Sequence, residues 1–299
     1  METVTVAIAG ASGFLGSHLG SFLEQHGYTI KRFVRRPAKN LSEIFWDPQN
    51  GQIDANALNG VDIVVNLAGE NIATGRLTKA KKKRAWDSRV KSTELLVRTM
   101  LSLKHKPKLF ISQSATGFYG DGGGDELDED AARGNGFFAD LAVAWERAAD
   151  PLAKSEVRVM HPRTAPVLGR DGGMLKSLIP IYRLGLGAIL GSGKQYMSWI
   201  EQSDFNRAML HIIRNPGLTG PINFACPGAI TNMEFTHALA KVLHRPVMLK
   251  VPATALRLLL GEVSEQLLES SRVVPTKLVA SGFQFEYPSL KQALAHNLR

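Results

Sequence analysis

A glycine-rich segment near the N-terminus constrains the fold of this chain more than any other feature of its 299 residues. Gly10, Gly13 and Gly16 stand three residues apart. They follow a β-branched run at 3–9 and open an apolar pattern of helical spacing at 13–26. A strand that turns tightly into a helix presents free backbone N–H groups to an anion. The segment therefore predicts a strand–turn–helix unit that binds the pyrophosphate of a dinucleotide.

Each glycine of this turn has a predicted role. Gly10 permits the tight turn, Gly13 lets the backbone approach the pyrophosphate, and Gly16 allows the helix to pack closely on the strand. The residues of the turn that we expect to contact the cofactor are Gly10, Ser12, Gly13, Phe14, Leu15 and Gly16.

Strand-like and helix-like segments alternate through the first half of the chain, which predicts βαβ units and a parallel sheet. The expected strands are 29–34, 62–67, 108–112 and 157–161, and the expected helices are 78–104 and 137–153. After about Gly169, Gly and Pro become frequent, and helices are expected at 232–243 and 253–268. We expect an α/β fold: a doubly wound parallel sheet of the Rossmann type over 1–169 and a smaller C-terminal lobe over 170–299.

The identity of the dinucleotide is predicted from the end of the second strand. An NAD site usually has Asp or Glu there, which bonds the ribose 2′-hydroxyl. This chain has Arg35 and Arg36 instead, and guanidinium groups pair well with the oxygens of a 2′-phosphate. The sequence therefore favours NADP(H) over NAD, although two basic residues at this point also occur as an ordinary solvated pair.

The spacing Gly-x-x-Gly-x-x-Gly resembles that of short-chain dehydrogenases of the extended type. The segment 60–69 is similar to the fourth strand of that family, whose end packs against adenine and ribose. The resemblance assigns cofactor contacts there to Leu67, Ala68, Gly69 and Glu70. The segment 112–120 resembles the one that carries the catalytic serine or threonine of the family, which here is Ser114.

The usual catalytic pair of that family, Tyr-x-x-x-Lys, is missing. Phe138 and Ala142 stand at the two positions, and the only matching spelling, Tyr287 to Lys291, lies in the C-terminal tail. Ser114, Tyr119 and Glu70 are therefore the candidate catalytic residues. Each also has an ordinary interpretation: a satisfied loop hydroxyl, a packed ring and a surface carboxylate.

This departure points to a narrower group. The segments 66–72, 87–89, 145–146 and 163–169 resemble atypical short-chain dehydrogenases of the epimerase-family, YfcH-like group. The tail, at about 249–297, resembles the C-terminal module of that group, of the DUF1731 type. The resemblance implies a Rossmann fold that binds NADP(H), and it names no substrate.

Four further residues are candidates for ligand contacts. Arg89 is expected to reach a cofactor phosphate or a substrate carboxylate, or else to form a helix salt bridge. Arg163 is assigned to the cofactor. Asn71 and Trp199 are assigned to the substrate, although large aromatic residues such as Trp199 more often belong to the core. Asp204 is expected to cap a helix, and His161 to be structural.

The leading function is an NADP(H)-dependent oxidoreductase or nucleoside-diphosphate-sugar epimerase-like enzyme that acts on a small polar substrate. The alternative is a non-catalytic NADPH-binding sensor or scaffold. Nucleic-acid binding is a third class, because the chain has a net charge of +9 and a basic cluster at 79–84. No nucleic-acid motif accompanies this cluster, so a solvated helix face is expected instead.

Composition excludes several other classes. The single cysteine, Cys226, excludes an internal disulfide and a zinc site built on several thiolates, and no spacing of His, Asp or Glu indicates a metal. The N-terminus lacks the pattern of a signal peptide, and no apolar run is long enough to cross a bilayer. We therefore expect a cytoplasmic protein with a small-molecule substrate and neither nucleic acid nor membrane as partner. The oligomeric state is not predicted.

Overall fold

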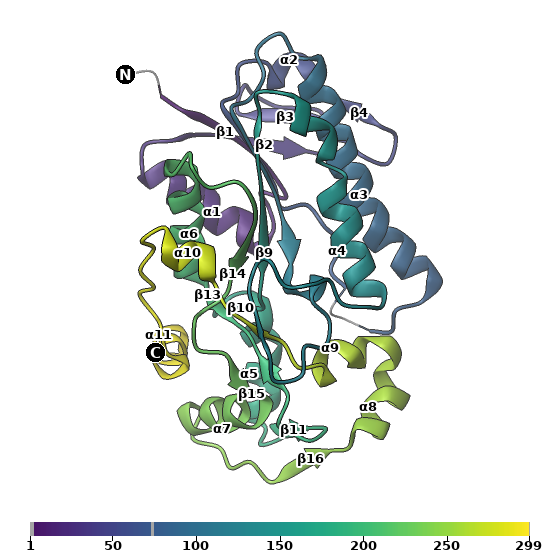
Figure 1. The fold of residues 1–299 in the computed structure, drawn as a ribbon, viewed down its shortest axis with the longest axis vertical. Coiled ribbons are helices and arrows are strands. Elements are labelled where there is room, and N and C mark those ends of the chain that lie inside the picture. Colours follow the sequence, from purple (N-terminus) through teal and green to yellow (C-terminus); the bar gives the residue numbers. More distant parts are fainter. Residues whose placement is uncertain (1–2, 73–74, 299) are drawn as a thin grey trace.

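A mostly parallel sheet runs through the centre of the computed structural model, which describes residues 3–72 and 75–298 (Figure 1). In these residues its strands follow the order β14-β9-β6-β5-β1-β2-β3-β4, and β7 also pairs with β9. The strands are β1 Thr5–Ala9, β2 Thr29–Val34, β3 Glu43–Asp47, β4 Gln52–Ile53, β5 Ile63–Asn66, β6 Leu109–Ser112, β7 Ser114–Ala115, β9 Arg158–Thr164 and β14 Gly220–Phe224. All pairs in this sheet are parallel except β3 with β4.

Helices cover both faces of the sheet because the strands are apolar on both faces. In β1, Val6 and Ile8 pack on the side of α1 and α6, whereas Ala7 and Ala9 pack on the side of α3. Figure 1 shows the two layers on opposite sides of the sheet. The helices around the sheet are α1 Phe14–Gln25, α2 Ala55–Leu58, α3 Lys79–Ser102, α4 Phe137–Arg147, α6 Gln202–Arg214 and α10 Thr276–Ala280. The expected doubly wound α/β fold is confirmed.

The lobe lies at the carboxyl end of the sheet, below it in Figure 1. Its strands are short and pair two by two. Its elements are β10 Val167–Leu168, α5 Gly173–Arg183, β11 Ala188–Leu190, β12 Tyr196–Met197, β13 Ile200–Glu201, β15 Ile230–Thr231, α7 Asn232–Val242, β16 Leu249–Val251, α8 Ala253–Leu260, α9 Glu265–Leu268 and α11 Leu290–Leu298.

Two of the expected helices are interrupted. The expected helix 137–153 ends as α4 at Arg147, and a separate 3-10 helix, Asp150–Lys154, follows with Pro151 in its first turn. The expected helix 253–268 divides into α8 and α9 at Gly261, whose φ of 60° is unsuited to a right-handed helix. The other expected elements lie within three residues of their predicted ends.

The sheet does not end at residue 169, where the sequence placed the boundary between the two parts. Strand β14 lies beyond that residue and forms the edge of the sheet next to β9. Further along the chain, β17 Arg272–Val273 pairs with β8 Glu126–Leu127 of the first part. The segments after residue 169 therefore contribute to both parts of the molecule.

Candidate functional site

The glycine-rich turn lies against the end of β5. Gly10 has a φ of 78°, and a Cβ atom placed on it would stand 2.8 Å from the carbonyl carbon of Leu67. A Cβ atom on Gly16 would stand 2.2 Å from the oxygen of Gly10. Both positions therefore require glycine, the first for its backbone conformation and for space, the second for space.

The N-terminus of α1 has no side-chain cap. Gly13 is the N-cap residue, and a Cβ atom on it would come within 4 Å of one non-neighbouring atom only, the Gly10 oxygen at 3.3 Å. The first amides of the helix are thus left without a side-chain acceptor, and the space in front of Gly13 is open. This arrangement fits the pyrophosphate of a dinucleotide.

The other predicted residues of the turn differ in exposure. Ser12 is exposed, whereas Phe14 and Leu15 are half-buried. The ring of Phe14 packs directly against glycines of the lobe. A Cβ atom placed on Gly172 would lie 2.1 Å from this ring, so there is no room for a side chain there. His18 of the same helix bonds Asp171 at 2.9 Å. The glycine-rich turn is therefore fastened to the lobe.

At the end of β2 the two arginines have different surroundings. Arg36 bonds Glu43 of β3 with both terminal nitrogens, at 2.7 and 2.5 Å. These hydrogen bonds lower the pKa of Glu43 to about 2 and raise the pKa of Arg36. Arg35 is exposed and makes no hydrogen bond or ion pair with the residues that the structure describes. The sequence treated the two as equivalent, but only Arg35 has a guanidinium with no hydrogen-bond partner among the described residues.

Arg89 of α3 reaches the loop that follows β5. Both of its terminal nitrogens donate to the Glu70 carbonyl at 3.1 Å, and its guanidinium lies 5.2 Å from the Trp145 ring centre. Burial lowers the pKa of Arg89 to about 10, and the Glu70 charge opposes that shift. The expected helix salt bridge is absent from the ion pairs of the described residues. Arg89 is a half-buried cation without an ion-pair partner among the described residues, so its charge is available to an anion.

Ser114 lies at the carboxyl end of β6, as expected, and is buried. Its hydroxyl donates to Glu146 of α4 at 2.7 Å. Glu146 also receives two hydrogen bonds from Arg163 of β9, at 2.9 and 3.0 Å. Because a serine hydroxyl has one proton, Ser114 meets any further group as an acceptor only.

Three predicted site residues lie in the interior, and their burial and partners argue against their predicted roles. Tyr119 is 2% exposed, donates to Asn223 at 2.7 Å and accepts from Arg163, and its burial raises its pKa to about 12. Such a hydroxyl is neither accessible nor easily deprotonated. Arg163 is buried and committed to Glu146, so it does not bind the cofactor. Trp199 is fully buried and donates to the Gly228 carbonyl at 3.0 Å, so it does not stack on a substrate.

The predictions for Asp204 and His161 have different outcomes. Asp204 is not the cap of α6, because Glu201 fills that place. Instead, Asp204 accepts hydrogen bonds from the backbone of Glu286 and Tyr287, which fastens the C-terminal segment to α6. His161 is buried in β9, and burial lowers its pKa, in keeping with a structural histidine.

Glu70 and Asn71 follow β5 and border the loop at this edge of the sheet. The Glu70 carboxylate is half-buried and accepts from Nε of Arg84 at 2.9 and 3.0 Å, whereas Asn71 is exposed. The basic cluster at 79–84 is therefore not simply a solvated face. Lys81 is buried and donates to the Ile72 carbonyl, and Lys82 pairs with Glu262 of the lobe. The cluster holds this loop and the lobe to α3.

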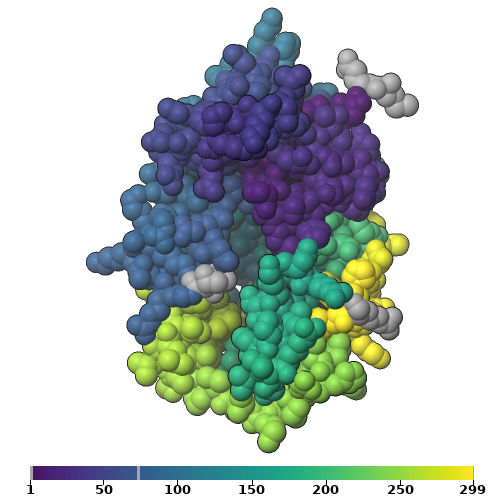
Figure 2. Space-filling view, turned by 180° about the vertical axis from the view of Figure 1, so that it is seen from behind, coloured from purple at the N-terminus to yellow at the C-terminus, as the bar shows by residue number. Residues whose placement is uncertain are grey.

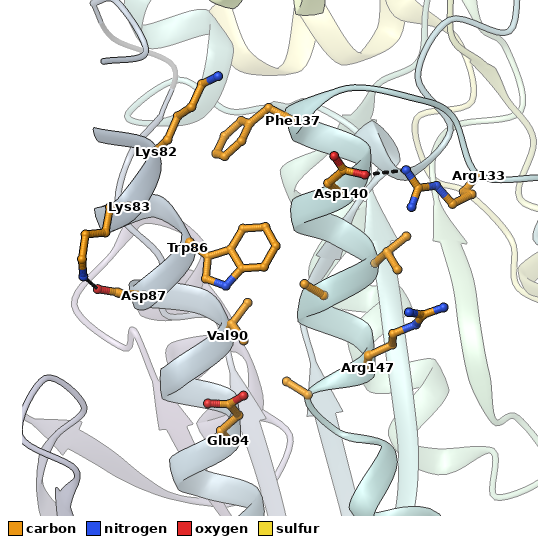
Figure 3. A pocket seen from close by; sticks show the side chains of 13 residues that line it. Lys82, Lys83, Trp86, Asp87, Val90, Glu94, Arg133, Phe137, Asp140 and Arg147 are labelled. Atoms are coloured by element: carbon orange, nitrogen blue, oxygen red, sulfur yellow. Dashed lines mark hydrogen bonds and ion pairs between the residues drawn. The ribbon is translucent and has the colours of Figure 1, made fainter. Parts of the chain in front are cut away.

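A groove of about 870 Å³ lies elsewhere, between α3 and α4 (Figure 3). Trp86 and Phe137 face each other across it, and charged residues of both signs form its rim. None of the predicted site residues lines this groove. Figure 2 shows a separate recess where the N-terminal segments, in purple and blue, meet the green lobe.

Sequence reasoning missed two residues of this region. Glu43 was not seen as the partner of Arg36, because the strand that carries it was not predicted. Glu146 entered the sequence analysis only as part of the segment 145–146. Its position one helical turn beyond Ala142 was the available signal that it faces Ser114.

Comparison with known proteins agrees with this geometry. The model of the NAD dependent epimerase/dehydratase family matches residues 6–224, and that of a domain of unknown function, DUF1731, matches residues 251–296. Epimerase family protein Mb2239 of Mycobacterium bovis is 41% identical over 297 residues, which cover 99% of this chain and 98% of the relative.

Two solved structures are similar over 99% of this chain at 30% identity. Human epimerase family protein SDR39U1, crystallised with NADPH, has a TM-score of 0.90 and is covered to 99%. The nucleoside-diphosphate sugar epimerase of Corynebacterium glutamicum has a TM-score of 0.82 and is covered to 58%. The chain therefore belongs to the NAD dependent epimerase/dehydratase family, with a C-terminal DUF1731 domain.

Proposed function

We propose that this chain binds NADP(H) and acts as an oxidoreductase or nucleoside-diphosphate-sugar epimerase-like enzyme on a small polar substrate. The observation that carries the cofactor assignment is Arg35, whose donors are uncommitted at the end of β2, where an NAD site would have an acid. The human relative that was crystallised with NADPH supports the same assignment.

Different residues of the chain would bind different groups of the cofactor. The uncapped amides at Phe14, Leu15 and Gly16 would hold the pyrophosphate. Arg35 would pair with the 2′-phosphate, and the backbone at 67–69 would border the adenosine. Arg89, which is half-buried and has no ion-pair partner among the described residues, would take a further anionic group of the cofactor or substrate. Bound NADP(H) would supply the hydride.

We assign proton transfer to the part of the site at the end of β5, where the side chains are half-buried. Glu70 is the candidate acid/base, because its carboxylate reaches the surface at the end of β5. A water molecule bound to the substrate is the other source. Ser114, whose proton is given to Glu146, would accept a hydrogen bond from a ligand hydroxyl or amide.

Cofactor titrations test this proposal. NADPH and NADH are titrated by fluorescence into the wild type, Arg35→Ala and Arg32→Ala. Arg32 is an exposed neighbour on β2 that pairs with Glu24 at 2.9 Å and serves as the matched control. We expect the wild type to prefer NADPH. Arg35→Ala should lose about tenfold in NADPH affinity and nothing in NADH affinity. Equal affinity of the wild type for the two cofactors would contradict the assignment.

A non-catalytic NADPH-binding role is the second candidate. It is favoured by Phe138 and Ala142 at the usual catalytic positions and by the burial of the Tyr119 hydroxyl. NADPH carrying tritium at C4 separates the two functions when it is incubated with a broad panel of carbonyl compounds. Oxidation or loss of tritium indicates an enzyme. Normal binding without either indicates a sensor or scaffold.

A further inference from the structure

The lobe exposes a group of apolar side chains at the end of the molecule away from the sheet. We call it the lobe tip. Met248 is 83% exposed, Leu184 75% and Leu186 53%, and Ile181 and Leu249 are also exposed. Single exposed apolar residues are common on protein surfaces, but a contiguous set marks an interaction site.

Backbone pairing brings these residues together from two distant segments. Ala188 of β11 is in register with Leu249 of β16, which places the residues before each strand side by side. The amide of Leu186 donates to the Ile181 carbonyl at 3.1 Å. Arg245 donates to the Arg183 carbonyl at 2.7 Å and so joins the turn after α5 to the segment before β16.

The two segments that carry the lobe tip have charges of one sign in their sequence. The segments 172–200 and 235–261, which contain it, hold no Asp or Glu. They hold seven basic residues: Lys176, Arg183, Lys194, Lys241, Arg245, Lys250 and Arg257. Arg183, Arg245 and Lys250 are exposed and flank the apolar side chains. The apolar side chains of the lobe tip thus have three exposed cations beside them.

We propose that the lobe tip docks onto the surface of an anionic lipid bilayer. Apolar side chains ringed by Lys and Arg bind such a surface by inserting among the headgroups while the cations meet anionic lipids. A second copy of the chain would bring like charges together and is disfavoured. In the part of the chain that the structure describes, no helix is long and apolar enough to span a membrane, so the attachment is peripheral.

The position of the lobe tip suits this attachment. β11 and β16 lie at the far end of the molecule from β1 and β2, at the bottom of Figure 1. The glycine-rich turn and Arg35 follow the carboxyl ends of β1 and β2, so the body of the lobe lies between them and the bilayer. This inference replaces the expectation from sequence that no membrane partner exists, and it does not depend on the proposed function.

Vesicle co-sedimentation tests the proposal. The full chain is mixed with vesicles of phosphatidylcholine alone or with phosphatidylglycerol added. The apolar variant is Leu184→Ser with Met248→Ser, and its control is Leu41→Ser, at a residue 93% exposed on the opposite part of the molecule. The charge variant is Arg183→Gln with Lys250→Gln, and its control is Lys104→Gln with Lys106→Gln, both exposed. Circular dichroism and NADPH titration confirm that each variant is folded.

We expect binding to the vesicles that contain phosphatidylglycerol and little to phosphatidylcholine. The apolar variant should bind about tenfold more weakly and the charge variant roughly twentyfold more weakly, whereas both controls bind as the wild type does. Three results would overturn the proposal: no sedimentation, equal binding of the lobe-tip variants and the wild type, or a dimer in the ultracentrifuge that Leu184→Ser with Met248→Ser converts to a monomer.

Discussion

At the scale of single residues, two glycines of α1 differ in what an added methyl group would meet. The Cβ atom of Gly16→Ala would lie 2.2 Å from the Gly10 oxygen, so the turn or the helix would have to move. The Cβ atom of Gly20→Ala would meet only side-chain atoms of Ile30 and Ile8 at 3.9 Å. We expect Gly16→Ala to lower the free energy of unfolding by about 1–3 kcal/mol and to weaken cofactor binding.

Gly20→Ala is the matched control and should raise the free energy of unfolding by about 0.5–1 kcal/mol, because alanine loses less backbone entropy in a helix. Urea unfolding measures both values. Equal effects of the two substitutions would show that the close contact of Gly16 with the turn does not change the free energy of unfolding.

Glu43 holds Arg36, which the sequence assigns to the 2′-phosphate of the cofactor. Because its pKa lies at about 2, below the ordinary 4.5, the carboxylate is ionised at neutral pH and occupies both terminal nitrogens of Arg36. Glu43→Gln removes this charge and frees the guanidinium. We expect NADPH affinity to rise severalfold and NADH affinity to stay unchanged. An unchanged ratio of the two affinities in fluorescence titrations would mean that Arg36 lies outside the 2′-phosphate site.

The same pair gives a dependence of stability on pH. A carboxyl group whose pKa is lower in the folded than in the unfolded state stabilises the fold above its unfolded value. The contribution of Glu43 is therefore complete above about pH 4.5, and it is lost as the pH falls through about 2. In acid titrations followed by circular dichroism, the loss of stability over this window should be smaller in Glu43→Gln than in the wild type.

At the scale of elements, the Tyr119 hydroxyl joins three parts of the sheet region. Tyr119 follows the 3-10 helix Thr116–Phe118, and its hydroxyl donates to Asn223 of β14 and accepts from Arg163 of β9. Tyr119→Phe should cost about 1–3 kcal/mol of stability, because a buried acceptor and a buried donor each lose a partner. NADPH binding and any turnover should persist.

Tyr28→Phe is the control for this substitution, since the Tyr28 hydroxyl has no hydrogen bond with the residues that the structure describes. It should leave the melting temperature unchanged. Loss of turnover in Tyr119→Phe at unchanged stability would restore Tyr119 as a proton donor.

The elements of the first half were predictable because their hydrophobic periods are clear. β2 was predicted at its observed ends, and α3 within two residues of them, with Thr78 as its N-cap. β14 was missed because Gly220 and Pro221 open it and its partner, β9, is distant in sequence. The missed helix α5 contains Pro180 within a glycine-rich stretch. Such elements are stabilised by tertiary pairing more than by local preference.

The site was predictable to the extent that it is local in sequence. The glycine-rich turn and the end of β5 follow from short motifs, and the structure brings them together across β1 and β5. The partners of charged residues are not local: Glu43 lies seven residues from Arg36, and Glu146 lies 32 residues from Ser114. Whether a hydroxyl or a guanidinium faces a ligand or the core depends on these partners, which no spacing reveals.

At the scale of the whole molecule, the C-terminal segment is built into the sheet region and is not a separate unit. β17 pairs with β8, and Nζ of Lys277 donates to the Pro221 carbonyl at 3.0 Å. Ser270 bonds the carbonyl of Gly123. We therefore expect the chain to unfold as one cooperative body, although its family models divide it at about residue 224.

Asn223 gives the sharpest test of this cooperativity. The residue is fully buried, its amide donates to Leu127 and Val274 carbonyls at 3.2 and 2.9 Å, and its backbone N–H donates to Glu129 at 2.9 Å. Asn223→Ala should lower the free energy of unfolding by about 1–3 kcal/mol or more, because several buried groups lose partners together. Hydrogen exchange read by mass spectrometry should show equal losses of protection in peptides from β1 and from α11. A loss confined to α11 would show instead that the C-terminal segment opens independently. The free energy of that local opening would then be smaller than the free energy of global unfolding.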